Sequence, residues 1–519
     1  MQHTTVTQGG NSMSVALKQT NVPELDFRES PLMSHTKINQ LMYSVLSNDL
    51  KFNDLEQKLF KVLQELFCTL LAEVLEQLDE QLMCSAKRQG WEVKDNHTRN
   101  IESSFGPLSF SRRYYSKTTT TGLKVYSYLL DEALGLGKNK NLSPRLTEMA
   151  IILASENSYR TSSKFLEEML GVKISHEGIR QAVQEAGEQI AKWDNESLLD
   201  NSGKKEVPLL VIEVDEVNVK QQIRNKPKKK RGDRKIFEMK VAVIYEGWEK
   251  ENQKSKPKLK NPSHFVYLGE AKEFWVTLER HLSREYSLEG CGLVIVGGDG
   301  ASWIQDGAEN MGAEYQYCRF HMERDLRRLF KDQKDIKKAI KKVIKEDELG
   351  KFNMILDALI TEAEEMQKEK LRVYKSLMNN VWGGLKDYRE RERQVPENAR
   401  GLGVIEPNVG HTVARRFKHR CASWSREGAI NLAKVRCSVR NGNLLELLNQ
   451  EVPTLTEENK NHQAAPTTQG LWGRRTADGL KKQNPGDWCS ATMPGGRSSN
   501  QAARHFARTM REISMDVFY

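Results

Sequence analysis

Short apolar runs in the middle of the chain alternate with stretches in which apolar residues recur at helical spacing. The run Leu209–Val214 predicts a buried strand that ends at Asp215, and two more strand-like runs follow at Ile236–Tyr245 and His264–Leu268. The spacing over Glu273–Arg284 is that of an amphipathic helix. This part of the chain therefore predicts three consecutive strands and a helix.

The alternation continues beyond this helix. Leu293–Val296 predicts a short buried strand leading to Asp299, and Ala301–Met311 predicts a helix. Glu314–Cys318 is typical of a fifth strand and Met322–Phe330 of the helix after it. Three strands, helix, strand, helix, strand, helix is the order of the RNase H-like fold. We therefore expect a multidomain α/β protein with an RNase H-like catalytic core.

Three acids are the candidate catalytic residues: Asp215 after the first strand, Asp299 between glycines after the fourth, and Glu406 in Gly-Val-Ile-Glu-Pro-Asn. In an RNase H-like fold, acids from the first strand, the fourth strand and a late helix meet at one edge of the sheet. Two rivals remain, since Glu213 shares a strand face with Asp215 and Glu427 is an alternative to Glu406. For Asp299, simple turn chemistry is the other interpretation.

Convergent carboxylates of this kind suit phosphoryl transfer. They can hold two divalent cations roughly 4 Å apart, which stabilises the attacking and leaving oxygens of an in-line displacement. Mg²⁺ is the expected ion because it prefers oxygen ligands, and Mn²⁺ is expected to substitute for it. The expected substrate is a phosphodiester, most plausibly DNA.

The N-terminal third of the chain predicts helices and a small sheet. The polar leader is followed by one long amphipathic helix over Asp49–Gly90, whose leucine spacing favours packing within the chain over a coiled-coil dimer seam. Alternation between Gly106 and Leu130 predicts a hairpin sheet, with Arg112 and Arg113 exposed to solvent or DNA.

A helix-turn-helix pattern comes next. Ser158–Leu170 and His176–Glu185 have helical spacing, and the turn between them begins at Gly171. Arg180 and Gln181 would then face bases from the second helix. An ordinary helical hairpin is the alternative.

Charge placement agrees with a nucleic-acid partner. The formal net charge is +10, from 80 basic and 70 acidic residues. One basic cluster follows the first strand and a second follows Glu406, where phosphates would approach the acids. The alternative for each is a solvated surface. The candidate DNA-binding residues in the clusters are Lys228, Lys229, Lys230 and Arg231, and then Arg415, Arg416 and Lys418.

Other features limit the class of protein. No apolar stretch approaches the roughly 20 residues of a membrane helix, and the N-terminus lacks the layout of a signal peptide. The seven cysteines are scattered and odd in number, which indicates a reducing cytoplasm. Cys318 and His321 form a pair after Asp299, but two ligands do not complete a tetrahedral zinc site.

Five segments also carry a family resemblance: Val214–Glu216, Gly298–Ile304, Cys318–His321, Gly403–Glu406 and Trp424–Ala429. Over about residues 50–445 the chain resembles ISLre-type insertion-sequence transposases, a prokaryotic family related to the Mutator-like DDE transposases.

The resemblance implies a transposase that cuts and joins the ends of a mobile element, with Asp215, Asp299 and Glu406 holding two Mg²⁺ ions. By resemblance Cys318 and His321 belong to the catalytic core. The implied partners are double-stranded DNA, as terminal inverted repeats and target, and further copies of the chain, with the protein at the nucleoid. A site-specific nuclease and a catalytically inactive DNA-binding derivative are the alternatives.

The expected domains are a disordered leader (1–48), a helix with a hairpin sheet (49–140), a helix-turn-helix region (141–200), the first part of the core (205–332), a helical insertion (333–395), the final core helices (396–450) and a basic polar tail (451–519).

Overall fold

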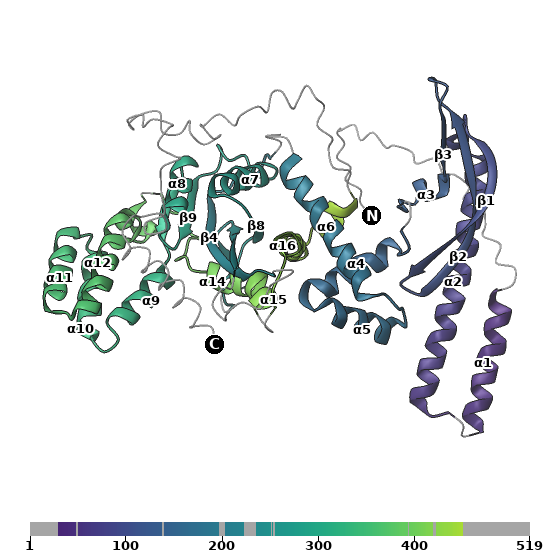
Figure 1. The fold of residues 1–519 in the computed structure, drawn as a ribbon, viewed down its shortest axis with the longest axis horizontal. Coiled ribbons are helices and arrows are strands. Elements are labelled where there is room, and N and C mark those ends of the chain that lie inside the picture. The colour runs from purple at the N-terminus through teal and green to yellow at the C-terminus, as the bar shows by residue number, and fades with distance from the viewer. Residues whose placement is uncertain are drawn as a thin grey trace, which may run out of the picture. The chain divides into compact units, whose positions relative to one another are not determined.

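The computed structural model describes residues 30–47, 50–137, 140–196, 203–222, 235–250, 252, 255–392, 394–418 and 422–449 (Figure 1). These divide into two compact units. The first contains the described residues up to Met149 together with Lys164–Ile174, and the second contains Ala150–Ser163 and the residues from Ser175 onward.

The first unit combines two helices with a three-stranded antiparallel sheet. Its elements are α1 (Ser30–Leu46), α2 (Phe52–Cys84), η1 (Ala86–Arg88), β1 (Glu92–Ser103), β2 (Gly106–Thr118), β3 (Lys124–Ser127) and α3 (Leu129–Ala133). The predicted long helix and hairpin sheet are confirmed. Leu75 of α2 packs with Ile101, Phe110 and Leu130, so this part of α2 lies against the core of its own unit.

Helix α1 lies where the leader was expected to be disordered. Its apolar residues recur at helical spacing, and Leu41 and Val45 are half-buried. Lys37 forms an ion pair with Glu65 of α2. The prediction of disorder is therefore wrong for Ser30–Leu46, because packing against α2 stabilises a helix that the short apolar pattern alone did not predict. Residues 1–29 lie outside the described part of the chain.

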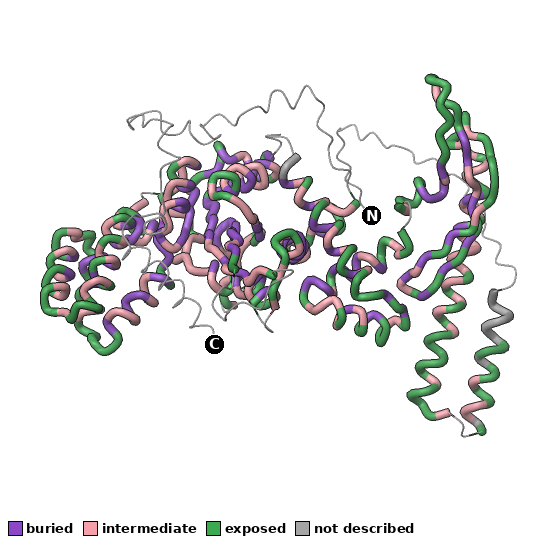
Figure 2. The backbone as a smooth tube through the Cα atoms, viewed as in Figure 1, coloured by how far each residue is buried: buried purple, intermediate pink, exposed green. Residues whose placement is uncertain are grey.

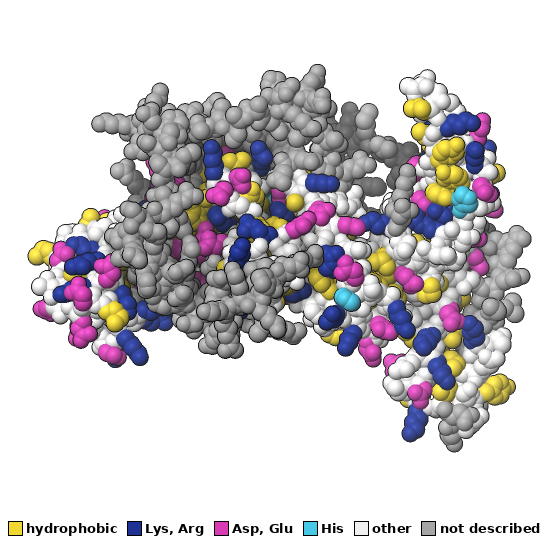
Figure 3. All heavy atoms as spheres, viewed as in Figure 1, with side chains coloured by type: hydrophobic (Ala, Val, Ile, Leu, Met, Phe, Trp, Pro, Cys, Tyr) yellow, Lys and Arg dark blue, Asp and Glu magenta, His cyan; other side chains and the backbone are white. Residues whose placement is uncertain are grey.

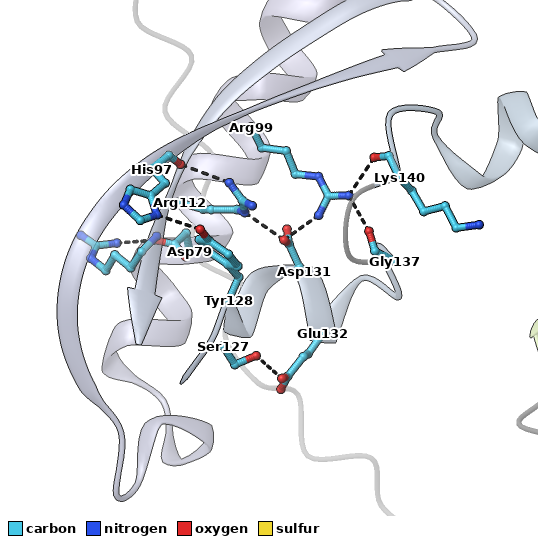
Figure 4. A network of polar contacts seen from close by, with 11 residues as sticks. Asp79, His97, Arg99, Arg112, Ser127, Tyr128, Asp131, Glu132, Gly137 and Lys140 are labelled. Carbon is cyan, nitrogen blue, oxygen red and sulfur yellow. Dashed lines mark hydrogen bonds and ion pairs between the residues drawn. The ribbon is translucent and has the colours of Figure 1, made fainter. Parts of the chain in front are cut away.

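Two arginines that were expected to be exposed are instead held in ion pairs (Figure 4). Arg112 is buried, and its Nε lies 2.9 Å from Asp131 Oδ2, an oxygen that Arg99 Nη1 also approaches to 2.6 Å. Arg113 Nη1 lies 2.7 Å from Asp79. The prediction that Arg112 and Arg113 face solvent or DNA is wrong, because each faces a carboxylate from a helix packed against the sheet.

The second unit is built on a five-stranded mixed sheet in the order β10-β9-β4-β5-β8. Its strands are β4 (Leu209–Lys220), β5 (Ile236–Tyr245), β8 (Ser263–Tyr267), β9 (Leu293–Gly298) and β10 (Glu314–Tyr317). Strands β4, β5 and β8 pair antiparallel, whereas β9 and β10 run parallel to β4. The predicted strands are confirmed, as is the mixed α/β class. Figure 2 shows that the tube is mostly buried through this sheet.

One face of the sheet is covered by α7 (Ala271–Ser283) and α8 (Ser302–Asn310). Leu210, Ile212 and Val214 of β4 enter a core that contains Phe274 and Ile304 of these helices. Because side chains alternate along a strand, Glu213 and Asp215 lie on the opposite face.

The other helices of the second unit come before and after the sheet. The α4 (Pro144–Glu156) and α5 (Tyr159–Leu170) helices cross the boundary between the units, and α6 (His176–Glu196) follows the turn at Gly171, whose φ is +67°. Helix α16 (Arg426–Asn441) packs against α6 and β8, and α17 (Leu444–Asn449) ends the described chain.

Helices also fill the segment between the fifth strand and Glu406. They are α9 (Arg319–Leu329), α10 (Lys334–Lys345), α11 (Leu349–Glu362), α12 (Glu365–Asn380), η2 (Trp382–Gly384) and α13 (Tyr388–Arg391). They share a core that includes Leu326, Phe352 and Met378. A small pair, β6 (Trp248–Glu249) with β7 (Lys258–Leu259), was not predicted, since two-residue strands carry no period. Over the described ranges, no helix has the length and apolar character needed to cross a membrane.

The buried Asp131 cluster gives a first prediction. Asp131→Asn leaves Arg99 and Arg112 without a charged partner, so we expect the first unit to lose about 3 kcal/mol of stability. Urea unfolding, with hydrogen–deuterium exchange of β1 and β2 peptides, measures the loss. Asp95→Asn is the matched control, since the Asp95 side chain is 70% exposed. Equal stability of the two variants would contradict the prediction.

Candidate active site

Asp215 lies in the middle of β4. The prediction that the strand ends at this residue is wrong, because Val217 and Val219 continue the alternation and are buried. The Glu216 N–H donates to Asp215 Oδ1 at 2.8 Å. The half-buried carboxylate therefore projects from a rigid central strand.

Asp299 follows β9, which is the parallel neighbour of β4. Glu213 of β4 pairs with Gly297 of β9. Asp215 and Asp299 each come two residues after this pair, so they lie side by side on neighbouring parallel segments. The next residue, Gly300, has φ +90°, and a Cβ there would be 2.8 Å from Tyr317. A larger residue at position 300 would thus disturb the turn that carries Asp299.

His321 enters the same place from the first turn of α9. The Cys318 N–H donates to the Gly298 carbonyl at 2.7 Å and holds the start of this helix against β9. Ligand atoms of Asp215, Asp299 and His321 all lie within 4.8 Å of one another. His321 is 5% exposed, and its Nε2 is 3.1 Å from Glu406 Oε1.

Glu406 is in the first turn of α14 (Ile405–Val409), with Pro407 beside it. This helix continues as a π-helical turn, η3 (Gly410–Ala414), and then as α15 (Arg415–Lys418), and α14 and α15 both contact β4. Glu406 therefore lies beside His321, which in turn lies beside Asp215 and Asp299. Glu427, the alternative, is exposed in the first turn of α16.

Glu213 holds the helix that carries Glu406. Its buried carboxylate accepts the N–H of Gly403 at 3.0 Å, of Val404 at 3.3 Å and of Ile405 at 3.1 Å. Tyr245 donates its hydroxyl to the same carboxylate at 2.6 Å. A carboxylate at a helix N-terminus satisfies free N–H groups and complements the helix dipole. With its oxygens engaged in this way, Glu213 acts as a positioning residue.

The π-helical turn is fixed by a buried arginine from α16. Arg436 donates to the Thr412 carbonyl at 2.6 Å and to the His411 carbonyl at 2.7 Å, and it also donates to the Ser155 carbonyl. π turns are rare and leave irregular carbonyl positions, which a five-donor guanidinium can satisfy. A basic residue inside an apolar helical pattern was the available sequence signal for this role.

Crowding of acids controls the electrostatics. Burial and the neighbouring Asp299 and Glu406 raise the pKa of Asp215 well above its usual value. Burial also raises the pKa of Glu406, although Arg324 opposes this. Ionised together, these carboxylates repel one another, so the cluster favours a cation or a proton between them.

His321 and Cys318 are both neutral at pH 7. Burial lowers the pKa of His321 to about 4, with Arg324 and Arg328 acting in the same direction against Asp299. Burial raises the pKa of the Cys318 thiol to about 12. A neutral imidazole can ligate a metal through nitrogen, whereas a protonated thiol is a poor ligand.

The donor set fits a divalent cation. It has two carboxylates and a neutral imidazole, and the buried Nδ1 of His321 has no hydrogen-bond partner among the described residues. Asp215, Asp299 and His321 would hold such an ion, with Glu406 beside them. The sequence predicted an all-carboxylate set, and the closeness of His321 depends on a contact that only the fold creates.

The predicted DNA-binding residues have different surroundings. Lys228, Lys229, Lys230 and Arg231 lie outside the described residues. On α6, Gln181 is exposed, and so is Arg180, whose guanidinium is 2.7 Å from Glu177. Ser175 Oγ accepts the Gly178 N–H at 3.0 Å and so caps this helix.

The residues of α15 differ in the same way. Arg415 and Lys418 are exposed, but the Arg416 guanidinium stacks 4.9 Å from the Trp424 ring. Partial burial of its ammonium lowers the pKa of Lys418, whereas the charges of Asp215 and Glu406 act to raise it. Lys418 therefore interacts electrostatically with these acids. The role of Arg324 near His321 and Glu406 was not predicted. The available signal was its position three residues after His321, which places both on one face of the helix.

The chain belongs to UPF0236, an uncharacterised protein family, whose model matches residues 45–451. A UPF0236 protein of Caldanaerobacter subterraneus subsp. tengcongensis is 27% identical over 402 residues, which are 77% of this chain and 80% of that protein, and its name joins eleven gene designations. A Streptococcus gallolyticus UPF0236 protein, named for the vanSb 3′ region, is 27% identical over 407 residues, covering 77% and 85%.

Among solved structures, the Drosophila P element transposase strand transfer complex is similar over 63% of this chain and 86% of that chain. The sequence identity is 10% and the TM-score is 0.21. A likeness at this level is below what a fold assignment needs.

Repulsion among the acids gives a second prediction. A raised carboxyl pKa means that ionisation costs folding free energy at pH values above the unfolded pKa, near 4. Asp215→Asn should therefore raise the Tm of the metal-free protein at pH 7.5 by roughly 2–6 °C, with the difference vanishing below about pH 4. Mg²⁺ or Mn²⁺ should raise the Tm of the wild type and have little effect on the variant.

Differential scanning fluorimetry in EDTA and in excess metal measures both effects, and Glu427→Gln is the matched control. A lower Tm for metal-free Asp215→Asn, or equal metal stabilisation of the two proteins, would contradict the prediction.

Glu213 gives a third prediction. Glu213→Gln places an amide NH₂ against three N–H donors, so we expect a loss of about 2 kcal/mol in unfolding free energy. Hydrogen–deuterium exchange should increase in the peptide that contains Gly403–Val409. Glu216→Gln, on the other face of β4, controls for charge removal; unchanged exchange at 403–409 in Glu213→Gln would rule the role out.

Proposed function

We propose that this protein is a DNA transposase with an RNase H-like core, of the ISLre type related to the Mutator-like DDE transposases. The observation that carries the proposal is the convergence of Asp215, Asp299 and Glu406, with His321, beside two parallel strands. The order β10-β9-β4-β5-β8, with two antiparallel neighbours on one side of β4 and parallel strands on the other, supports the same core.

The relatives support a mobile element. A single protein name that joins eleven gene designations in one bacterium describes a sequence present at many loci. Multiplication within a genome is what a transposase gene carried on its own element produces. A regulatory DNA-binding protein would have no comparable reason to occur many times.

Divalent cations bound at this site, Mg²⁺ or Mn²⁺, would neutralise charge that develops on the attacking and leaving oxygens. Asp215 and Asp299 present their carboxylates from β4 and from the end of the neighbouring strand β9. His321 Nε2 lies 3.1 Å from Glu406 Oε1, so an imidazole protonated at Nε2 would help to orient that carboxylate. Glu213 fixes the helix that carries Glu406, and Lys418 offers an exposed cation to a phosphate beside the acids.

The proposed reaction has two in-line displacements. Water first attacks a phosphodiester at the element end and frees a 3′-hydroxyl; that hydroxyl then attacks a phosphodiester of the target DNA. Each step forms one P–O bond and breaks another, so neither requires a covalent enzyme intermediate. Double-stranded element ends and target DNA are the proposed partners, with recognition by Arg180 and Gln181 of α6 and assembly of several copies on DNA.

The experiment is divalent-dependent cleavage and joining of DNA that carries the sequences flanking the gene. Asp215→Ala and Asp299→Ala should lose about a thousandfold or more in rate, since residues that act as a unit fail together. Both should retain binding of the same DNA in fluorescence anisotropy. Glu406→Ala and Glu427→Ala form a matched pair, and only the former should lose activity.

The products separate the alternatives. Joining of pre-cleaved ends to target DNA supports a transposase, whereas hydrolysis without joining would show a site-specific nuclease. Binding without cleavage by the wild-type protein would indicate an inactive derivative and overturn the proposed activity.

A further inference from the structure

A cluster of aromatic rings lies on one face of the three-stranded sheet of the first unit, far in sequence from the acids. His97 pairs across the strands with Arg112, and Tyr126 pairs with Ser116. Cross-strand partners share a face, and residues two apart on a strand do so as well. Tyr114 therefore lies on the same face as His97 and Tyr126. The ring of Tyr128, the residue after β3, lies 5.9 Å from that of His97.

The four rings form one continuous group. The Tyr114 ring is 5.6 Å from Tyr126, at an interplanar angle of 12°, and 4.8 Å from Tyr128. His97 lies 5.2 Å from Tyr114. Tyr126 is 40% exposed and the His97 side chain is 42% exposed, so part of this ring group is accessible to a ligand.

Figure 3 shows the surface at this place. Over the region that Figure 1 labels β1 and β3, hydrophobic side chains adjoin Lys or Arg side chains and a histidine. An open aromatic face in this unit thus has cations at its border.

Contacts with neighbouring side chains hold His97 and Tyr128 in place (Figure 4). The Arg112 guanidinium stacks 3.7 Å from the Tyr128 ring while its Nε binds Asp131, and the Tyr128 hydroxyl is 2.7 Å from His97 Nδ1. Side chains fixed before binding lose little conformational entropy when a ligand arrives. The ion pairs that bury Arg112 thus make the aromatic face rigid.

A β-bulge brings a cation to the same face. The register of β1 shifts between Val93 and Asp95, and Lys94 is the extra residue. Its Nζ lies 5.6 Å from the centre of the Tyr126 ring. Bulges re-aim side chains, and here the re-aimed ammonium stands where the phosphate of a stacked nucleotide would need it.

Other charges favour a polyanion. Lys117 and Lys124 are exposed on β2 and β3, and residues 86–133 carry eight basic and five acidic side chains, a net charge of +3. Asp95 is the acid nearest the rings, and its carboxylate is 3.4 Å from His97 Nε2. The balance around the rings matches a ligand that combines flat bases with phosphates.

We propose that this aromatic face, made of His97, Tyr114, Tyr126 and Tyr128 with Lys94, binds single-stranded DNA by stacking unpaired bases. Bases inside a duplex have both faces covered, so ring surfaces on an open sheet select an unpaired strand. The choice of DNA over RNA rests on the proposed transposase function, in which strands at a cut end can separate; the stacking itself does not depend on the acids.

The test uses the full-length protein in EDTA, so that catalysis is absent, with fluorescein-labelled oligo-dT of about 20 nucleotides and anisotropy as the readout. Tyr126→Ala should weaken binding roughly 5- to 100-fold, in line with about 1–3 kcal/mol per stacked base. Tyr126→Phe should bind like the wild type because the ring remains. Val125→Ala is the matched control, because Val125 lies on the opposite face and is 39% exposed in the wild type. It should bind oligo-dT with wild-type affinity.

Two further measurements complete the test. Lys94→Gln should reduce the salt dependence by about 0.7 in the slope of log K against log salt. Ultraviolet cross-linking of iodouracil-substituted oligonucleotide should map to peptides of β1, β2 or β3.

Several results would overturn the inference: wild-type binding by Tyr126→Ala, cross-links confined to the second unit, or tighter binding of a labelled duplex than of oligo-dT. Stronger binding of oligo-rU than of oligo-dT would refute DNA as the ligand. None of these depends on metal or cleavage, so failure here and failure of the proposed activity are distinguishable.

Discussion

The geometry of the acid cluster in the second unit depends on a buried carboxylate, Glu213, that does not itself reach the cluster. Burying an ionised Glu costs several kcal/mol unless its oxygens are fully engaged. Glu213 meets this condition with the N–H groups of residues 403–405 and the Tyr245 hydroxyl. Gly403 has φ +129°, and Gly297 leaves the space that Glu213 and Leu402 occupy. The approach of Glu406 to β4 thus depends on one side chain and two glycines.

That arrangement holds like charges together against their repulsion. Asp215 lies on β4 and Asp299 directly follows β9, the strand paired with β4, so this pairing keeps the two acids close when both are ionised. Folding therefore supplies the energy that holds these acids together, at a cost in stability that a bound cation would offset. Arg436 contributes by fixing the π-helical turn that separates Glu406 from Lys418. This turn keeps the Glu406 carboxylate and the Lys418 ammonium near the same cluster of acids.

The sequence predicted what its periodicity encodes. Ile236–Tyr245 was placed to the residue because strand and apolar run coincide, and the acids were found because each follows or interrupts such a run. The function of Glu213 was hidden because its partners are 190 to 192 residues away. Arg112 was misjudged for a related reason: alternation shows which face a residue is on, but not that Asp131 of α3 lies beside it there.

The two proposed DNA contacts differ in what they can do for a reaction. Stacking on the aromatic face would be the same before and during phosphoryl transfer, so it would raise affinity without lowering the barrier to chemistry. In the proposed reaction the acids would act on charge that appears only during the displacement. Since the aromatic face and the acids belong to separate units, with no described residue in common, losses of binding and of rate should combine almost additively. A strong departure from additivity would mean that an unpaired strand held by the first unit is what delivers the phosphodiester to Asp215 and Asp299.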